Sequence, residues 1–327
     1  MPHVHLPAPR QPHVIVVADG EGSVLDLDPA LVVDLYKTHG AILFRGFGLD
    51  VAAFRDFARQ FCTTSVVNES PGREAVDGPA NVFTVDPGVR AFSLHPELSR
   101  EPWKPDVAFF GCLVAPRAGG QTTLCDGVAL VRALPPGLYQ ALAHRRLLYI
   151  KQTWPSLLRY WLGTETPSDA QLASPPPGCP YEFRRFPDGE IVRYFTRPAL
   201  HKPMFIDAPA FGNFLLFARF NHGRNDHPVM DDGNPMPEAW LHAIRDTGAA
   251  LEVPVGWQAG DLLMLDNTRF MHGRTEITDP SERRILTYFG YLGFAVPDSE
   301  EPHDAIWRRE NFEPPLRPDH PRYVETA

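Results

Sequence analysis

GDLLMLDNTRFMHGR, at residues 260–274, and FSLHPE, at residues 92–97, carry the strongest pattern in this sequence. The apolar run at residues 262–265 predicts a buried strand, and Asp266-Asn267 ends that run ahead of a second short segment that carries His272. In the upstream stretch, His95 and Glu97 are two residues apart. Side chains at that spacing point to the same side of a β-strand, because side chains alternate between its two faces.

Two imidazoles and one carboxylate can therefore converge on one metal ion. His95, Glu97 and His272 would cover one face of an octahedral ion and leave three positions open, which is the facial arrangement of non-haem Fe(II) oxygenases. Two other classes of protein fit the same residues. The three ligands could hold Zn²⁺ for hydrolysis with a metal-bound water as nucleophile, or the histidines could be structural groups in a non-catalytic β-barrel binding module.

Four segments, in this order along the chain, resemble the taurine dioxygenase family. They are HGAILFRGF at residues 39–47, the His-x-Glu of residues 95–97, GGQT at residues 119–122, and residues 260–274 followed by Arg283-Arg284. The resemblance extends over residues 30–295. It implies a mainly β (α+β) fold with a double-stranded β-helix (jelly-roll) core flanked by helices, and an enzyme that uses Fe(II), 2-oxoglutarate and O₂.

The resemblance also suggests how 2-oxoglutarate binds. Thr122, in the GGQT segment, is expected to hold the 2-oxoglutarate carboxylate through its hydroxyl, with Thr123 as the alternative. Arg284 heads a predicted strand at residues 285–291, and its planar guanidinium suits the distal carboxylate of 2-oxoglutarate. Arg283 is expected to point to the opposite side of that strand, into solvent.

Candidate substrate residues are Arg274, Asn68 and Tyr288. Arg274 follows His272 by two residues and is either a pocket residue or a surface arginine. Tyr288 stands where taurine dioxygenase carries a substrate-binding arginine, which argues against a sulfonate substrate. Asn68 lies in a polar segment, residues 63–89, that is either a substrate lid or a connector.

The carboxylate ligand bears on the reaction outcome. Related halogenases lack it, so Glu97 favours hydroxylation of an aliphatic C–H, with release of succinate and CO₂. Desaturation, cyclisation and oxidative decarboxylation use the same iron set and are alternatives. The His-x-Glu variant is familiar among relatives that act on amino acids, so we expect an amino-acid-derived or other small natural-product substrate, possibly tethered to a carrier.

Composition excludes several partners. The formal net charge is −9, which disfavours nucleic acid. No run of 18 apolar residues and no basic-then-apolar leader is present, so neither a membrane span nor a signal peptide is predicted. The four cysteines show no CxxC spacing, and in a chain of 327 residues they are expected to be reduced thiols in the cytoplasm. The sequence does not indicate an oligomeric state.

The whole chain, residues 1–327, is expected to form one oxygenase domain. Residues 151–237 are expected to be an insertion between core strands that covers the pocket mouth. Apolar spacing predicts strands at residues 41–44 and 107–115 and a hairpin over residues 184–195. The same criteria predict helices at residues 29–38, 51–61, 128–142 (interrupted by Pro135-Pro136) and 237–247, with Gly248 just past the last of them.

Overall fold

The structure is a computed structural model that describes residues 1–67, 70, 72–315 and 317. Near the N-terminus, helix α1 (Pro29–His39) begins where the Asp28 carboxylate accepts a hydrogen bond from the Ala30 N–H at 3.0 Å. It ends at Gly40, whose φ of 75° needs the left-handed region that glycine tolerates. Helix α2 (Val51–Phe61) buries three phenylalanines. Both helices confirm the sequence prediction.

The larger of two core sheets is built around strands that read as apolar runs. Its order is β1-β2-β3-β15-β8-β17-β6-β5, and β4 pairs with the end of β17. The strands are β1 (His3–His5), β2 (Val14–Val17), β3 (Ala41–Arg45), β4 (Cys62–Ser65), β5 (Ala75–Asp77), β6 (Val82–Thr84), β8 (Val107–Val114), β15 (Leu262–Asp266) and β17 (Arg284–Leu292). Helix α2 packs on the face of this sheet that carries Phe109 and Tyr288.

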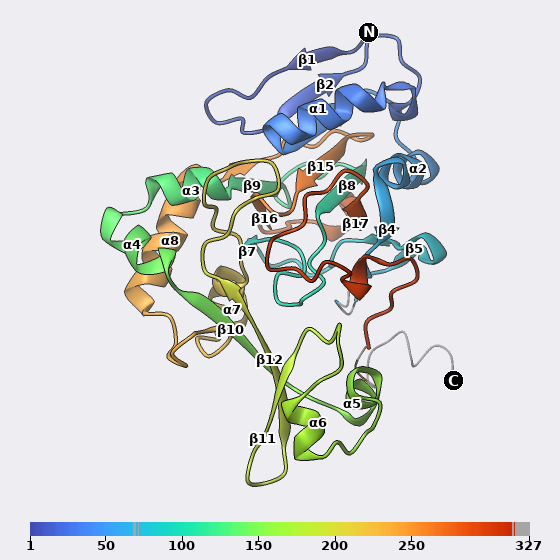
Figure 1. The fold of residues 1–327 in the computed structure, drawn as a ribbon. Helices are drawn as coiled ribbons and strands as arrows, with labels where there is room; N and C mark the ends of the chain where they lie inside the picture. Colours follow the sequence, from blue (N-terminus) through green and yellow to red (C-terminus); the bar gives the residue numbers. More distant parts are fainter. Residues whose placement is uncertain (68–69, 71, 316, 318–327) are drawn as a thin grey trace.

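The smaller core sheet has the order β14-β9-β16-β7. Its strands are β7 (Phe92–His95), β9 (Thr122–Asp126), β14 (Val253–Pro254) and β16 (Phe270–Arg274). It faces the larger sheet, because the ring of Phe110 on β8 lies 5.0 Å from the ring of His272 on β16. The two sheets form the expected jelly-roll core, and helices α3 (Gly127–Ala133), α4 (Pro136–Ala143) and α8 (Glu238–Leu251) lie beside the smaller one (Figure 1).

A third sheet, with the order β11-β12-β10-β13, extends away from the core (Figure 1). Strands β11 (Glu182–Arg185) and β12 (Ile191–Pro198) form the predicted hairpin. Strand β10 (Arg146–Gln152) begins ahead of residue 151, and β13 (Val229–Met230) completes the sheet. Helices α5 (Pro155–Leu162) and α6 (Asp169–Ala173) lie at its far end, whereas α7 (Leu215–His222) returns to pack against β7.

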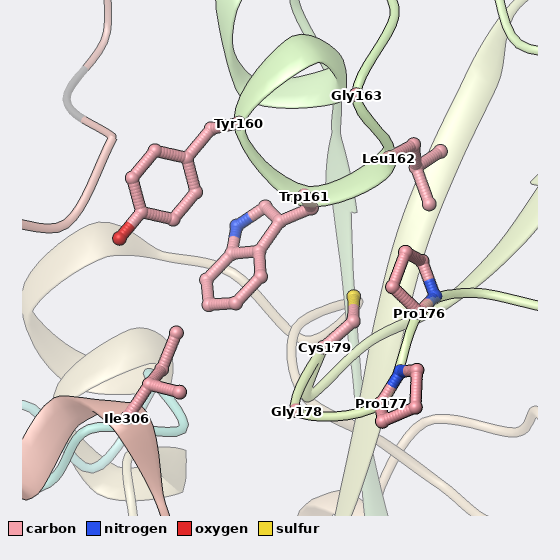
Figure 2. A pocket seen from close by; sticks show the side chains of 9 residues that line it. All are labelled: Tyr160, Trp161, Leu162, Gly163, Pro176, Pro177, Gly178, Cys179 and Ile306. Atoms are coloured by element: carbon pink, nitrogen blue, oxygen red, sulfur yellow. The ribbon is translucent and has the colours of Figure 1, made fainter.

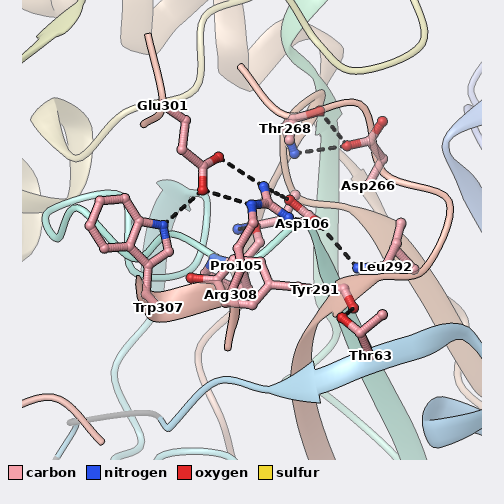
Figure 3. Close-up of polar contacts among 11 residues, drawn as sticks. Thr63, Pro105, Asp106, Asp266, Thr268, Tyr291, Leu292, Glu301, Trp307 and Arg308 are labelled. Atoms are coloured by element: carbon pink, nitrogen blue, oxygen red, sulfur yellow. Dashed lines mark hydrogen bonds and ion pairs between the residues drawn. The ribbon is translucent and has the colours of Figure 1, made fainter. Parts of the chain in front are cut away.

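The C-terminal segment is fastened to the start of β8 by Arg308. This guanidinium donates to both carboxylate oxygens of Asp106, at 2.8 and 2.9 Å, and to Glu301 (Figure 3). The indole N–H of Trp307 donates to the same Glu301 carboxylate at 2.8 Å. Asp106 also accepts from the Leu292 N–H at 3.0 Å, so one buried carboxylate joins β8, the end of β17 and the C-terminal segment.

Two predictions about local structure are wrong. Gly248 lies inside α8, which continues to Leu251, rather than beyond its end. The glycine lets the helix approach Leu94, whose side chain would lie 3.1 Å from an added Cβ. The segment at residues 63–89 is not one long loop, since β5, β6 and most of β4 lie within it and join the larger sheet. None of the helices in the described part of the chain is both long and apolar enough to cross a membrane.

Candidate active site

The structure brings the three predicted metal ligands together. His95 ends β7 and pairs directly with His272 on β16, and the two ring centroids are 4.6 Å apart. Glu97 follows β7 by two residues, and its Oε1 lies 3.3 Å from His272 Nε2. One ligand atom from each residue lies within 4.8 Å of the other two. This spacing allows all three to bind a single ion.

The protonation states of His95 and Glu97 suit a divalent metal. Burial and the neighbouring His272 lower the pKa of His95 to about 3, so its ring is neutral at neutral pH. Burial alone would raise the pKa of Glu97, but Arg73, His272 and His95 outweigh it and lower that pKa, so the carboxylate is ionised. His272 Nδ1 is buried with no hydrogen-bond partner among the described residues. A neutral imidazole and an ionised carboxylate are forms that bind metal, so the cluster fits the ion that the sequence predicted.

Asn267 holds Glu97 in place. Its carboxamide Oδ1 accepts from the Glu97 N–H at 2.8 Å, and its Nδ2 donates to the Glu97 carbonyl at 3.1 Å and to the Pro105 carbonyl at 2.8 Å. From the sequence alone, Asn267 is only one of the two residues that end an apolar run. The residue type could have indicated its role, because a fully buried asparagine must find hydrogen-bond partners for its amide.

Aromatic rings surround the cluster. Phe110 on β8 lies 5.0 Å from His272, and Phe217 on α7 lies 4.4 Å from His95, measured between ring centroids. Phe217 comes from the region expected to be an insertion, so that region does reach the predicted ligands. Such rings lower the local dielectric and keep water from the histidines.

The structure contradicts the choice of Arg284 as the 2-oxoglutarate ligand. The Arg284 side chain is 49% exposed and points to Glu74 at 3.8 Å, on the outer side of β17. Arg283 is the arginine that turns inward. Its Nε donates to the Gly120 carbonyl at 2.6 Å, and burial together with Arg274 lowers its pKa to about 10.

Arg283, Arg274 and Thr122 face one region. Arg274 pairs opposite Thr122 across β16 and β9, and the Thr122 hydroxyl accepts a hydrogen bond from the Trp257 indole at 3.2 Å. Neither Arg274 nor Arg283 forms an ion pair with a carboxylate within the residues that the structure describes. Thr123, the alternative to Thr122, donates its hydroxyl to Glu252 instead. Two buried cations and a hydroxyl therefore lie where an anion would be stabilised.

Besides contributing positive charge, the Arg274 side chain binds the backbone of a neighbouring segment. Its terminal nitrogens donate to the carbonyls of Asp86, Gly88 and Arg90, and its guanidinium lies 4.1 Å from the centre of the Phe92 ring. These contacts fasten residues 86–90 to β16. These three hydrogen bonds give Arg274 a structural role, while its Nε is buried with no hydrogen-bond partner among the described residues.

Tyr288 is not a substrate residue in this structure. It packs against Phe109, with ring centroids 6.1 Å apart, in the apolar layer beneath α2. The next residues on either side, Thr287 and Phe289, face the metal cluster and contact Arg73. Neighbouring residues of a strand point to opposite faces, so Tyr288 points away from the cluster. Asn68 lies outside the described residues.

A cavity of about 460 Å³ lies elsewhere, between α5, residues 176–179 and Ile306 (Figure 2). Tyr160, Trp161, Pro176 and Pro177 are among its lining residues. None of the predicted metal or 2-oxoglutarate residues lines it. This cavity belongs to the third sheet and the C-terminal segment, not to the candidate active site.

Comparisons with known proteins agree with the fold and the cluster. The family model described as "Taurine catabolism dioxygenase TauD, TfdA family" matches residues 14–288. A clavaminate synthase-like protein of Arabidopsis thaliana is 27% identical over 275 residues, which cover 77% of this chain and 82% of that protein.

Solved structures give the same fold. A taurine dioxygenase from Burkholderia xenovorans matches with a TM-score of 0.60 and 16% identity, covering 94% of this chain and 97% of the other. The PvcB protein from Pseudomonas aeruginosa matches with a TM-score of 0.59 and 14% identity, covering 91% and 94%.

The fold and the two-histidine, one-carboxylate cluster define an Fe(II)- and 2-oxoglutarate-dependent dioxygenase. The chain belongs to the TauD/TfdA family of these enzymes.

Proposed function

We propose that this enzyme hydroxylates an aliphatic C–H of a small molecule. In that reaction the substrate, O₂ and 2-oxoglutarate give the alcohol, succinate and CO₂. The observation that carries this proposal is the complete set of His95, Glu97 and His272, because the carboxylate occupies the position that chlorination would need to leave open. Bound iron with 2-oxoglutarate supplies the oxidising power, and the residues of the chain supply position and a dry surrounding.

We assign Arg283 and Thr122 to the distal carboxylate of 2-oxoglutarate. The Arg283 guanidinium already lies at the GGQT turn, where its Cδ comes within 2.9 Å of the place that a Gly120 Cβ would take. Gly120 therefore makes room for the arginine. The Thr122 hydroxyl accepts from Trp257 and so is oriented to donate toward an anion. The Arg274 charge adds to the attraction for that anion without a direct bond.

Relatives support a small natural product as the substrate class. One relative is named for its likeness to clavaminate synthase, and one structural match is described as an oxygenase from an isonitrile synthetic pathway. No nucleic-acid or membrane partner forms part of the proposal, and we assign the enzyme to the cytoplasm. The formal net charge of −9 is consistent with a small-molecule enzyme that avoids polyanions.

The test uses anaerobic protein to which Fe(II) and then 2-oxoglutarate are added. A visible charge-transfer band is expected, since the two together form the chromophore. His272→Ala should abolish the band, whereas His303→Ala, at a side chain 98% exposed, should keep it. A band that is absent from the unaltered protein, or that persists in His272→Ala, contradicts the proposal. Succinate release stimulated by members of a panel of free amino acids, carrier-tethered amino acids and small carboxylates then identifies the substrate.

A further inference from the structure

We propose that Arg73 binds a free carboxylate of the substrate beside the metal. The inference rests on the proposed function and names the substrate class: short carboxylic acids whose carboxyl group is not masked by a carrier. Nothing in the sequence pattern singled out Arg73, which follows the polar segment at residues 68–72.

The Arg73 side chain lies against the inner face of β17, beside the metal cluster. Its Nη2 lies 3.4 Å from Glu97 Oε1, and its Nη1 donates to the Thr287 hydroxyl at 3.2 Å. The guanidinium carbon lies 5.5 Å from the centre of the Phe289 ring, and the side chain is only 10% exposed. Arg73 Nε is buried with no hydrogen-bond partner among the described residues. A guanidinium offers five N–H donors, so this one has capacity left over.

The charges around Arg73 call for one more anion. When Glu97 is a metal ligand, its negative charge is shared with a divalent cation, and Arg73 loses the counterion it has in this structure. The metal-binding end of 2-oxoglutarate neutralises the remaining metal charge, and its distal carboxylate pairs with Arg283. Arg73 is then a buried cation with no counter-charge among the described residues, which is costly in a low-dielectric surrounding. A substrate carboxylate removes that cost.

Arg73 is separate from the 2-oxoglutarate anchor. Arg73 contacts Thr287, whereas Arg283 lies four residues earlier and contacts Gly120. Four residues of extended strand correspond to about 13 Å. The distal carboxylate of 2-oxoglutarate is assigned to Arg283, which contacts Gly120 and not Thr287. The two cations therefore serve two different anions.

The position of Arg73 also limits which carbon is oxidised. A carboxylate oxygen that accepts from Arg73 lies within about 2.9 Å of the guanidinium, and that guanidinium is 3.4 Å from a metal ligand atom. The carboxylate is thus no more than roughly 11 Å from the ion, allowing about 2 Å for the metal–oxygen bond and about 2 Å between two nitrogens of one guanidinium. The reacting C–H lies a few bonds from the carboxylate, and a thioester or amide at that carboxyl loses the ion pair.

The test follows the charge-transfer band of the anaerobic protein with Fe(II) and 2-oxoglutarate. The probes are straight-chain acids from acetate to hexanoate, phenylacetate, the free amino acids, and the primary amide of each. Acids are expected to shift the band, and the matching amides to bind at least about tenfold more weakly, as expected for a lost charge-assisted hydrogen bond. Arg73→Met should weaken acid binding by a similar factor, and Arg73→Lys should restore part of it. The matched control is Arg284→Met, which removes an exposed arginine on the outer face of the same strand.

Each result decides between the proposals. A shift by acids but not amides that depends on Arg73 supports the inference. The inference about Arg73 is overturned if no acid shifts the band, if acids and amides shift it equally, or if Arg73→Met binds acids fully. In each of these cases the band itself still supports the proposed function. A band missing from the unaltered protein overturns the proposed function instead. If Arg73→Met does not form the band, the acid-to-amide ratio in Arg73→Lys decides, and a ratio unchanged from that of the unaltered protein overturns the inference.

Discussion

Asn267 clamps Glu97 by both of its backbone polar groups, at 2.8 Å to the N–H and 3.1 Å to the carbonyl. The clamp is needed because Glu97 lies beyond the end of β7, where no ladder partner satisfies its backbone. The Asn267 N–H in turn donates to the Asp106 carbonyl at 2.9 Å. Since Arg308 binds the Asp106 carboxylate, the C-terminal segment contributes indirectly to holding a predicted metal ligand (Figure 3).

Asn267→Ala should weaken metal binding by about 10- to 100-fold, which is the usual effect of losing a group that orients a ligand. It should also destabilise the protein by about 1–3 kcal/mol, because buried backbone groups at Glu97 and Pro105 lose their partner. Metal affinity is measured by competition with a chelator, and stability by urea unfolding of the metal-free protein.

Asn213→Ala is the matched control for this change. Asn213 is also buried and also binds backbone, donating to the Ala199 carbonyl at 3.2 Å and accepting from the Leu215 N–H at 3.1 Å. This variant should lose stability and keep its metal affinity. Equal loss of metal affinity in the two variants would mean that general destabilisation, rather than the position of Glu97, explains the effect.

Gly273→Ala should separate the two strands that carry the histidines. A Cβ at Gly273 would lie 2.6 Å from the Phe92 carbonyl of β7 and 2.8 Å from the Thr123 hydroxyl of β9. Backbone oxygen cannot move without moving its strand, so we expect β7 to shift away from β16. Overpacking of this kind costs about 1–3 kcal/mol of stability, and metal affinity should fall with it, as measured by chelator competition.

Gly137→Ala tests that the effect comes from crowding and not from loss of glycine. Gly137 is the second residue of α4, and nothing lies within 4 Å of the Cβ that alanine would add. The free energy of unfolding should rise by about 0.4–1 kcal/mol, because alanine restricts the unfolded chain. Unchanged metal affinity in Gly273→Ala would show that β7 and β16 keep their spacing.

The metal ligands could be predicted from sequence, but the arginine beside them could not be placed on the correct face. In β17, the residues from Ile285 onward are buried on both sides of the strand. A strand buried on both faces reads as a continuous apolar run, so its sequence contains no alternation to fix which residues point inward. A shift of one residue exchanges the two faces. Arg284 and Tyr288 were therefore placed only by resemblance to the taurine dioxygenase family, and in the structure Arg283 and Thr287 face the site instead.

Arg73 and Asn267 were missed for a different reason. Arg73 meets Glu97 across 24 residues and Asn267 meets it across 170, so neither contact has a local signal in the chain. Helices such as α1 and α2 were predictable because their caps and apolar spacing are local. The positions of side chains around the metal depend on how the two sheets pack, which no single segment encodes.

Arg283→Met and Arg284→Met separate the two neighbouring arginines. Arg283→Met should weaken 2-oxoglutarate binding at least about tenfold, because a charged hydrogen bond to its carboxylate is lost. Arg284→Met should change it by no more than about twofold, since Arg284 is half exposed and 3.8 Å from Glu74. Titration of the charge-transfer band with 2-oxoglutarate gives both affinities. The reverse order of the two effects would restore Arg284 as the anchor.

Stability of the metal-free protein should fall as the pH drops from about 6.5 toward 4, because burial lowers the pKa of His13 and His227 to about 4 and that of His201 to about 3. In this window the unfolded chain takes up protons on these histidines and the folded chain does not, so each contributes a loss of up to about 1.4 kcal/mol per pH unit. Asp266 acts in the opposite direction below pH 6, since burial raises its pKa to about 6.

His201→Gln removes one titrating group and can still donate to the Thr268 carbonyl, which His201 Nε2 contacts at 2.6 Å. Urea unfolding of both proteins between about pH 7 and pH 5 should give a shallower fall for His201→Gln, and parallel curves would contradict the assignment of a neutral, buried His201.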